Sequence, residues 1–264
     1  MFLSTFNEAT SNINPTRNFN LLYIILDSIF IVVLLTLFIL KKRYLTLIFA
    51  LIGGVLYFIV DYGYFYLISE SRVISIDGNV VGNLETALVL LWMSLSYGIT
   101  NFAFIWLCLS KDKYLKYWLI LIVGWWLVAP SIATLGGENN IQTYRTTNQY
   151  HGAMAIILVA GYLGLIIYYM FKKEHKMMNI LWLILIGVSV QFAWEFALLI
   201  NGIRPMNENS IQTLLVNSLI ETNLGMPYIY LIYLGVTKYF NEDLSKKNKD
   251  SEIKENKNIE KIDK

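Results

Sequence analysis

Seven long apolar runs, separated by short polar segments, dominate the pattern of hydrophobic and polar positions along this chain. They cover approximately residues 20–40, 44–69, 86–109, 115–135, 152–171, 178–201 and 211–237. Each run supplies the ~20 residues that a helix needs to cross the hydrocarbon core of a bilayer. The runs do not alternate with the two-residue period of strands, which argues against a β-barrel. The pattern therefore predicts an all-α polytopic membrane protein with seven transmembrane helices.

Composition supports this class, and the basic residues predict the orientation. The chain is 56% hydrophobic and 15% charged, with a mean hydropathy of +0.51, which is outside the usual range of soluble domains. Four basic residues, Arg17, Arg72, Arg145 and Arg204, fall on one side of the predicted membrane, and the other 17 of the 21 fall on the opposite side. Because cytoplasmic loops carry the excess of Lys and Arg, we expect a cell-membrane protein with its N-terminus outside and its C-terminus in the cytoplasm.

The two ends of the chain differ from the apolar runs. Residues 1–19 lack the basic segment and apolar core of a signal peptide, so we expect them to form an external segment. Residues 241–264 are mostly Lys, Glu, Asp, Asn and Ser, which predicts a disordered cytoplasmic tail, with a helix on the lipid surface as the alternative. Cys108 is the only cysteine, so the chain can form no internal disulfide and offers no zinc ligand set.

Two apolar segments, 134 residues apart, resemble one another without a gap. Residues 51–62 read LIGGVLYFIVDY and residues 185–196 read LIGVSVQFAWEF, so that Asp61 aligns with Glu195. A repeated apolar segment with an acid at the same place indicates a duplicated membrane fold whose site lies between the halves. We therefore predict two parallel three-helix repeats, at 20–110 and 152–240. A connector helix at 111–136 and an external loop at 137–151 would join them.

The resulting 3+1+3 arrangement of helices is similar in layout to the SWEET sugar carriers and to the nicotinamide riboside carriers. The resemblance covers the seven spans as topology, and the Pro-Gln pair of SWEET-type repeats is absent from this sequence. SWEETs place an asparagine from the third helix of each half at the sugar. Asn101 and Asn223 lie on the comparable helices here. By analogy, the resemblance implies that these two side chains contact a solute.

Four acids, Asp27, Asp61, Glu195 and Glu221, fall inside predicted spans. With about 1.5 Å of rise per residue, they lie roughly 10–15 Å below the external surface, and four acids at one depth predict a ring around an external cavity. A carboxylate at membrane depth is costly and normally faces the bundle interior or water. No Lys or Arg lies well inside any span, so we expect these acids to lack a cationic partner from the chain. They would then be protonated, face an open external cavity, or bind a cation from outside.

Polar and aromatic side chains lie close to these acids in the helical pattern. Many of them are three or four residues away, which places them on the same helix face. The candidate solute- or cation-binding residues are Asp27, Tyr57, Asp61, Tyr64, Asn101, Gln191, Trp194, Glu195, Asn217, Glu221 and Asn223. Ordinary structural roles compete with this interpretation. Aromatics near span ends form interfacial belts, and Asn in a span bonds a neighbouring helix. Gly53, Gly54 and Gly187 would permit close helix packing.

Three functions fit these features. The leading hypothesis is a carrier for a small polar or cationic solute, with proton or sodium coupling as an option. Asp61 and Glu195 would form its symmetric pair, and Trp194 would add cation–π attraction. The alternatives are an intramembrane enzyme that uses paired carboxylates on a lipid or lipid-linked substrate, and a receptor-like or accessory membrane subunit. The expected partners are the lipid bilayer and a small-molecule solute, with no cofactor and no nucleic acid.

Overall fold

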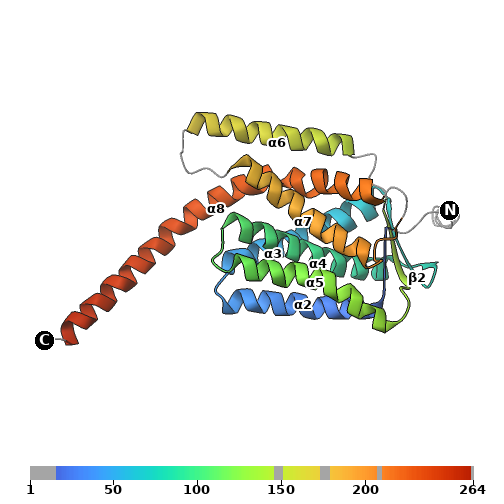
Figure 1. Ribbon diagram of the computed structural model, residues 1–264, viewed down its shortest axis with the longest axis horizontal. Helices are drawn as coiled ribbons and strands as arrows, with labels where there is room; N and C mark the ends of the chain where they lie inside the picture. The colour runs from blue at the N-terminus through green and yellow to red at the C-terminus, as the bar shows by residue number, and fades with distance from the viewer. Residues whose placement is uncertain (1–15, 146–150, 173–178, 207–209, 263–264) are drawn as a thin grey trace.

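The protein is mostly helical (79%), and its long helices lie side by side with a small sheet across one end (Figure 1). The computed structural model describes residues 16–145, 151–172, 179–206 and 210–262. Within this part of the chain, six helical segments are long and apolar enough to cross a membrane. This agrees with a membrane-embedded protein.

The six segments coincide closely with the first six apolar runs of the sequence. They are α2 (Leu21–Leu40), α3 (Tyr44–Phe58) with its continuation η1 (Ile59–Ile68), α4 (Asn83–Leu109), α5 (Leu115–Ala133) with the short 3-10 turn η2 (Thr134–Gly136), α6 (His151–Lys172) and α7 (Ile180–Ile200). The seventh apolar run, 211–237, lies within α8 (Ser210–Ile262). Helix α8 also continues through 241–262, where the sequence predicts a disordered tail. No Gly or Pro follows Gly235 to interrupt it.

Helix α4 forms the centre of the bundle. In its most apolar 18-residue stretch, 78% of the residues are buried, compared with 17% for α6 and 28% for α2. A helix that is buried on all sides must have neighbours all round it, and α4 packs against α2, α3, α5 and α7. Functional side chains on α4 are therefore held by several helices at once.

Glycines allow the closest helix contacts. A Cβ on Gly98 of α4 would lie 2.7 Å from the Cα of Gly54 on α3, so the two backbones touch there. In the second half of the chain, a Cβ on Gly187 of α7 would lie 3.0 Å from the Cα of Asn223 on α8. A Cβ on Gly53 would likewise enter the ring of Phe102. These contacts confirm the prediction that Gly53, Gly54 and Gly187 permit close packing.

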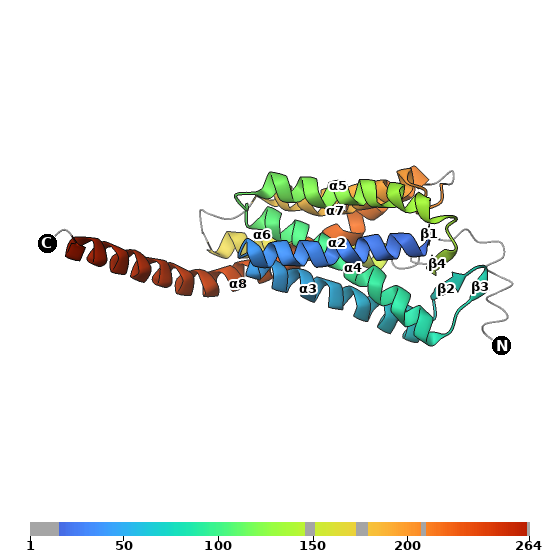
Figure 2. The same cartoon turned by 90° about the horizontal axis from the view of Figure 1, so that it is seen from below.

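Four short antiparallel strands form the sheet at one end of the bundle, which we call the sheet end (Figure 2). They are β1 (Arg17–Phe19), β2 (Arg72–Ile76), β3 (Asn79–Val80) and β4 (Ile141–Arg145), in the order β1-β4-β2-β3. The hydrophobic pattern predicts no strand in these segments, and β4 lies in the segment 137–151 that was expected to be a loop. One local signal was readable. Asp77-Gly78, with φ of 52° and 77°, forms the two-residue turn between β2 and β3.

The strand period of two places three arginines on the same face of this sheet. Arg72 on β2 lies directly opposite Arg145 on β4, and Arg17 on β1 lies opposite Thr143. Residues 143 and 145 are two apart on β4, so their side chains point to the same side. This face is the one turned toward the helices, because Thr143 and Ile74, which are paired on it, are fully buried.

We predict that Gly98→Ala destabilises the protein by about 1–3 kcal/mol, because the added methyl group must push the α3 and α4 backbones apart. Gly124→Ala on α5 is the matched control, since a Cβ there meets nothing within 4 Å. The measurement is the free energy of unfolding in mixed detergent micelles. Equal stabilities for the two variants would contradict the close contact.

Candidate functional site

Asp61 is the most heavily engaged acid at the sheet end. Arg145 donates from Nη1 to its Oδ1 at 3.0 Å, and the Nη2 of Arg72 lies 3.5 Å from its Oδ2. The hydroxyl of Tyr97, on α4, donates to the same Oδ2. Asp61 is 1% exposed, so one buried carboxylate holds two arginines of neighbouring strands.

The helix changes type where Asp61 lies. Helix α3 ends at Phe58 and continues as the ten-residue π-helix η1, a form that is rare and often found at functional sites. The wider turn moves the residue that shares the face of Asp61 from i+3 toward i+4 and i+5. Tyr64, expected on that face from α-helical spacing, is accordingly 41% exposed. Phe65 takes its place, and its ring lies 5.1 Å from the Arg145 guanidinium.

Glu195 on α7 has an equivalent arginine. The Nη2 of Arg204 lies 2.6 Å from its Oε2, and the Nη2 of Arg17 lies 3.9 Å from its Oε1. Gly202, with φ of 71°, ends α7 in a left-handed turn. This turn brings Arg204 back over the acid of the preceding helix.

A glutamine joins the two acids of the second half of the chain. The side-chain nitrogen of Gln191 lies 3.4 Å from Glu195 Oε1 and 3.3 Å from Glu221 Oε2. Arg145 reaches Glu221 as well, with 4.0 Å between its Nη2 and Oε1. Because Arg145 also holds Asp61, it connects the acid of η1 to the acid of α8.

The expectation that the acids have no cationic partner is therefore wrong for three of the four. No arginine lies within an apolar run, but the loops at the sheet end fold back onto the helices. One signal was available in the sequence. Arg72 follows Asp61 by 11 residues and Arg204 follows Glu195 by nine. Each acid is therefore followed by an arginine a few residues beyond the end of its helix.

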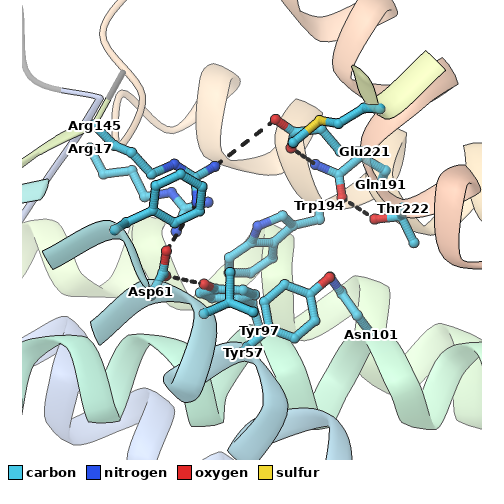
Figure 3. Close-up of a pocket in the computed structure, with 13 residues that line it drawn as sticks. Arg17, Tyr57, Asp61, Tyr97, Asn101, Arg145, Gln191, Trp194, Glu221 and Thr222 are labelled. Carbon is cyan, nitrogen blue, oxygen red and sulfur yellow. Dashed lines mark hydrogen bonds and ion pairs between the residues drawn. The ribbon is translucent and has the colours of Figure 1, made fainter. Parts of the chain in front are cut away.

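These charges surround a cavity of about 190 Å³ at the sheet end (Figure 3). Six of the predicted site residues line it: Tyr57, Asp61, Asn101, Gln191, Trp194 and Glu221. Lining residues that were not predicted are Arg17, Val60, Phe65, Tyr97, Arg145, Met154 and Thr222. Figure 3 shows Arg17, Arg145 and Asp61 on the left, Glu221 at the upper right, and the rings of Tyr57, Tyr97 and Trp194 between them and toward the bottom of the view.

The other predicted residues lie outside this lining. Glu195 is in the second layer, in contact with Gln191, and Asn223 accepts a hydrogen bond of 2.7 Å from the Tyr162 hydroxyl. Asn217 is buried on α8, and Tyr64 is turned outward. For Asn223, the ordinary role of a bond between helices is the one observed.

Asp27 belongs to a separate polar spot. It is 2% exposed, and its Oδ1 accepts a hydrogen bond of 3.1 Å from the indole nitrogen of Trp125 on α5. No arginine among the described residues lies within ion-pair distance of it. The predicted ring of four acids is thus a cluster of three, with Asp27 placed elsewhere between α2 and α5.

Two buried polar atoms in the cavity wall have no hydrogen-bond partner among the described residues. They are Oδ1 of Asn101 and Nε1 of Trp194, whose side chains are 1% and 4% exposed as residues. An unmade hydrogen bond of this kind costs about 1–3 kcal/mol. One is an acceptor and the other a donor, and both belong to side chains that line the cavity.

Arg72 and Arg145 remain charged at neutral pH. Burial lowers the pKa of Arg72 to about 10, and the Asp61 carboxylate limits this fall. Burial also lowers the pKa of Arg145, but the carboxylates of Asp61 and Glu221 outweigh it, and the net shift is upward. The described residues contain no cluster of three or more His, Cys, Asp or Glu suited to a metal ion. The cavity wall therefore carries fixed charges of both signs.

We predict that Asp61→Asn lowers the free energy of unfolding by about 3–5 kcal/mol, because it leaves the buried Arg72 guanidinium without its carboxylate and removes the closer of the two carboxylates of the partly buried Arg145. The matched control is Asp77→Asn in the exposed β2–β3 turn, where Asn also tolerates a positive φ. This control should change stability by less than about 0.5 kcal/mol. Similar effects of the two substitutions, measured in mixed micelles, would show that the ion pairs at Asp61 contribute little.

Comparison of the whole chain with models of known protein families, with curated proteins and with solved structures finds no match. The function must therefore be inferred from the residues of the chain itself.

Proposed function

We propose that this chain is an integral membrane carrier that binds a small polar solute in the cavity at the sheet end. The observation that carries this proposal is the cavity wall itself. It combines charges of both signs, four aromatic rings, and a buried donor and acceptor that have no partner among the described residues. Small-molecule sites have this composition of apolar surface with a few convergent polar groups.

The position of the cavity supports a carrier built from two halves. Tyr57 and Val60 line it from α3 and η1, and the aligned positions Gln191 and Trp194 line it from α7. Carriers with internal repeats place their sites between the repeats. The close contacts of Gly53 with α4 and of Gly187 with α8 are also equivalent under this alignment. We therefore propose the 3+1+3 duplication together with the function.

The proposed topology has seven spans, with the N-terminus outside and the C-terminus in the cytoplasm of a cell membrane. The first part of α8 would supply the seventh span, since it packs along α6 and α7. The lysine-rich loops lie at the end opposite the sheet, which would face the cytoplasm. The cavity would then open toward the outside.

The ion pairs change which solute and which alternatives fit. A purely cationic solute would need acids without partners, and the three acids near the cavity are held by arginines. The enzyme alternative loses support for the same reason, because a carboxylate fixed between guanidinium groups is a poor general base. A receptor-like subunit would use the same cavity without opening it to both sides.

We predict the orientation from the distribution of lysines. A fluorescent protein fused after Lys264 should mature in the cytoplasm, and alkaline phosphatase at the same position should stay inactive. In cysteine-free chains, Asp77→Cys, at the sheet end, should react with an impermeant maleimide added to intact cells. Lys113→Cys, at the other end, should not. The reverse labelling pattern would contradict the N-out topology.

The carrier mechanism predicts that the cavity is reachable from both sides of the membrane in turn. Cys108→Ser first removes the native thiol, and Thr222→Cys then places one in the cavity wall with little change of volume. Charged, impermeant methanethiosulfonate reagents should modify this thiol in both right-side-out and inside-out vesicles. Labelling from one side only would contradict a carrier and favour a receptor or an enzyme.

Ser94→Cys, in the same Cys108→Ser background, is the control for this experiment. Ser94 lies on α4, is fully buried and does not line the cavity. Its thiol should resist the reagents in both kinds of vesicle. Modification of both thiols at equal rates would indicate loosened packing and would remove the support for a gated cavity.

A further inference from the structure

Arg17 differs from the other arginines of the sheet end. Arg72, Arg145 and Arg204 each have a carboxylate oxygen within 3.5 Å, whereas the nearest carboxylate oxygen to Arg17 lies 3.9 Å away, on Glu195. Its side chain is nevertheless only 12% exposed. Four arginines share three acids in this cluster, so the described residues leave one positive charge there without a full counter-charge.

Aromatic rings hold Arg17 in place. Its guanidinium carbon lies 5.2 Å from the centre of the Tyr97 ring and 5.9 Å from the centre of the Trp194 ring. Cation–π contacts of this kind attract the charge through the ring faces and leave the N–H groups at the edge of the guanidinium available. Arg17 also lines the cavity, so it presents fixed donors to the space inside, as Figure 3 shows.

Further donors and acceptors lie in the same wall. Within the part of the chain that the structure describes, the buried indole N–H of Trp194, close to Arg17, and the buried amide oxygen of Asn101 have no hydrogen-bond partner. Glu221 adds a carboxylate whose ion pair is the longest of those in the cluster, at 4.0 Å from Arg145. One part of the cavity is therefore suited to an anionic group and another part to a hydrogen-bonding cation.

We propose that the solute is a small zwitterion of the amino-acid type. Its carboxylate would bind the Arg17 guanidinium, which favours planar carboxylates, together with the N–H of Trp194. Its ammonium group would donate to the amide oxygen of Asn101 and face the Glu221 carboxylate. This inference rests on the proposed function, because it takes the cavity to be the solute site.

The size of the cavity limits the side chain of such a solute. At about 190 Å³, the cavity far exceeds the ~10–15 Å³ that a single water needs on this measure, so it has room for a small solute. Glycine, alanine and serine are the smallest zwitterions of this class and should fit most readily. A size limit within one chemical class is a property that adventitious charge attraction would not produce.

The experiment is a binding measurement on the full chain in lipid nanodiscs, by thermal shift and by titration calorimetry. The probes are glycine, L-alanine and L-serine, with lactate, ethanolamine, choline and L-tryptophan for comparison. We expect the three small zwitterions to bind at least tenfold more tightly than lactate, ethanolamine or choline, and tryptophan to bind more weakly than alanine. If no small zwitterion binds at 10 mM, or if choline binds and alanine does not, the proposal is overturned.

Three variants test the assigned contacts. Arg17→Gln should weaken alanine binding by at least 100-fold, and Trp194→Phe, which keeps an aromatic ring and removes the N–H, by about tenfold. Arg43→Gln is the matched control. Arg43 pairs with Asp112 at the opposite end of the bundle, so its loss should leave alanine affinity unchanged. Unchanged alanine affinity in both Arg17→Gln and Trp194→Phe would overturn the proposal.

The outcomes separate this inference from the carrier proposal. If alanine binds as predicted but the thiol at position 222 is labelled from one side only, the recognition stands and the carrier mechanism fails. If labelling occurs from both sides but alanine and lactate bind equally, the assigned ammonium contacts are wrong. If neither of these two binds, the zwitterion assignment fails while the carrier proposal stands.

Discussion

The ion pairs of Asp61 are the constraint on which the sheet end depends. Arg72 and Arg145 lie directly opposite each other on neighbouring strands, an arrangement in which like charges repel. The Asp61 carboxylate removes this repulsion by presenting one oxygen to each arginine. A buried ion pair is weak evidence for net stability, but breaking one is costly because the remaining charge is left in a poor environment. The sheet can therefore pack against the bundle only where Asp61 pairs with both arginines.

The π-helical segment decides which side chains accompany Asp61 into the cavity. If α3 had continued as a regular α-helix, Tyr64 would share the face of Asp61. The wider turn of η1 keeps Phe65, at i+4, beside Asp61 and moves Tyr64, at i+3, off this face, where it is 41% exposed. Helix α7 stays regular through Glu195, and this acid lies behind Gln191. Two aligned acids thus take different positions because their helices have different local geometry.

The sequence predicted the helices and about half of the residues that line the cavity, but not the contacts that complete it. Long apolar runs locate membrane helices because each residue of the run contributes to the same signal. The packing glycines, the helix face with Tyr57 and Asp61, and the face with Gln191 on a second helix follow from local spacing. The strands of the sheet are two to five residues long, and β1 pairs with β4 across more than 100 positions. Such pairing leaves no local pattern. The basic residues outside the apolar runs indicate topology. The hydrophobic pattern does not indicate their second role, as ion-pair partners of the acids.

Tyr97 connects the ion pairs that hold the sheet to the part of the cavity where we propose that a solute binds. Its hydroxyl donates to Asp61, and its ring supports the guanidinium of Arg17. The three arginines with close carboxylate contacts have their charges satisfied by the protein, whereas the arginine held by aromatic rings keeps its donors available. A shift of Asp61 relative to α4 would move the Tyr97 hydroxyl, and with it the ring beneath Arg17. Movement of the sheet against the bundle and binding of a carboxylate by Arg17 would then be coupled through the Tyr97 side chain. The proposed carrier needs a coupling of this kind for alternating access.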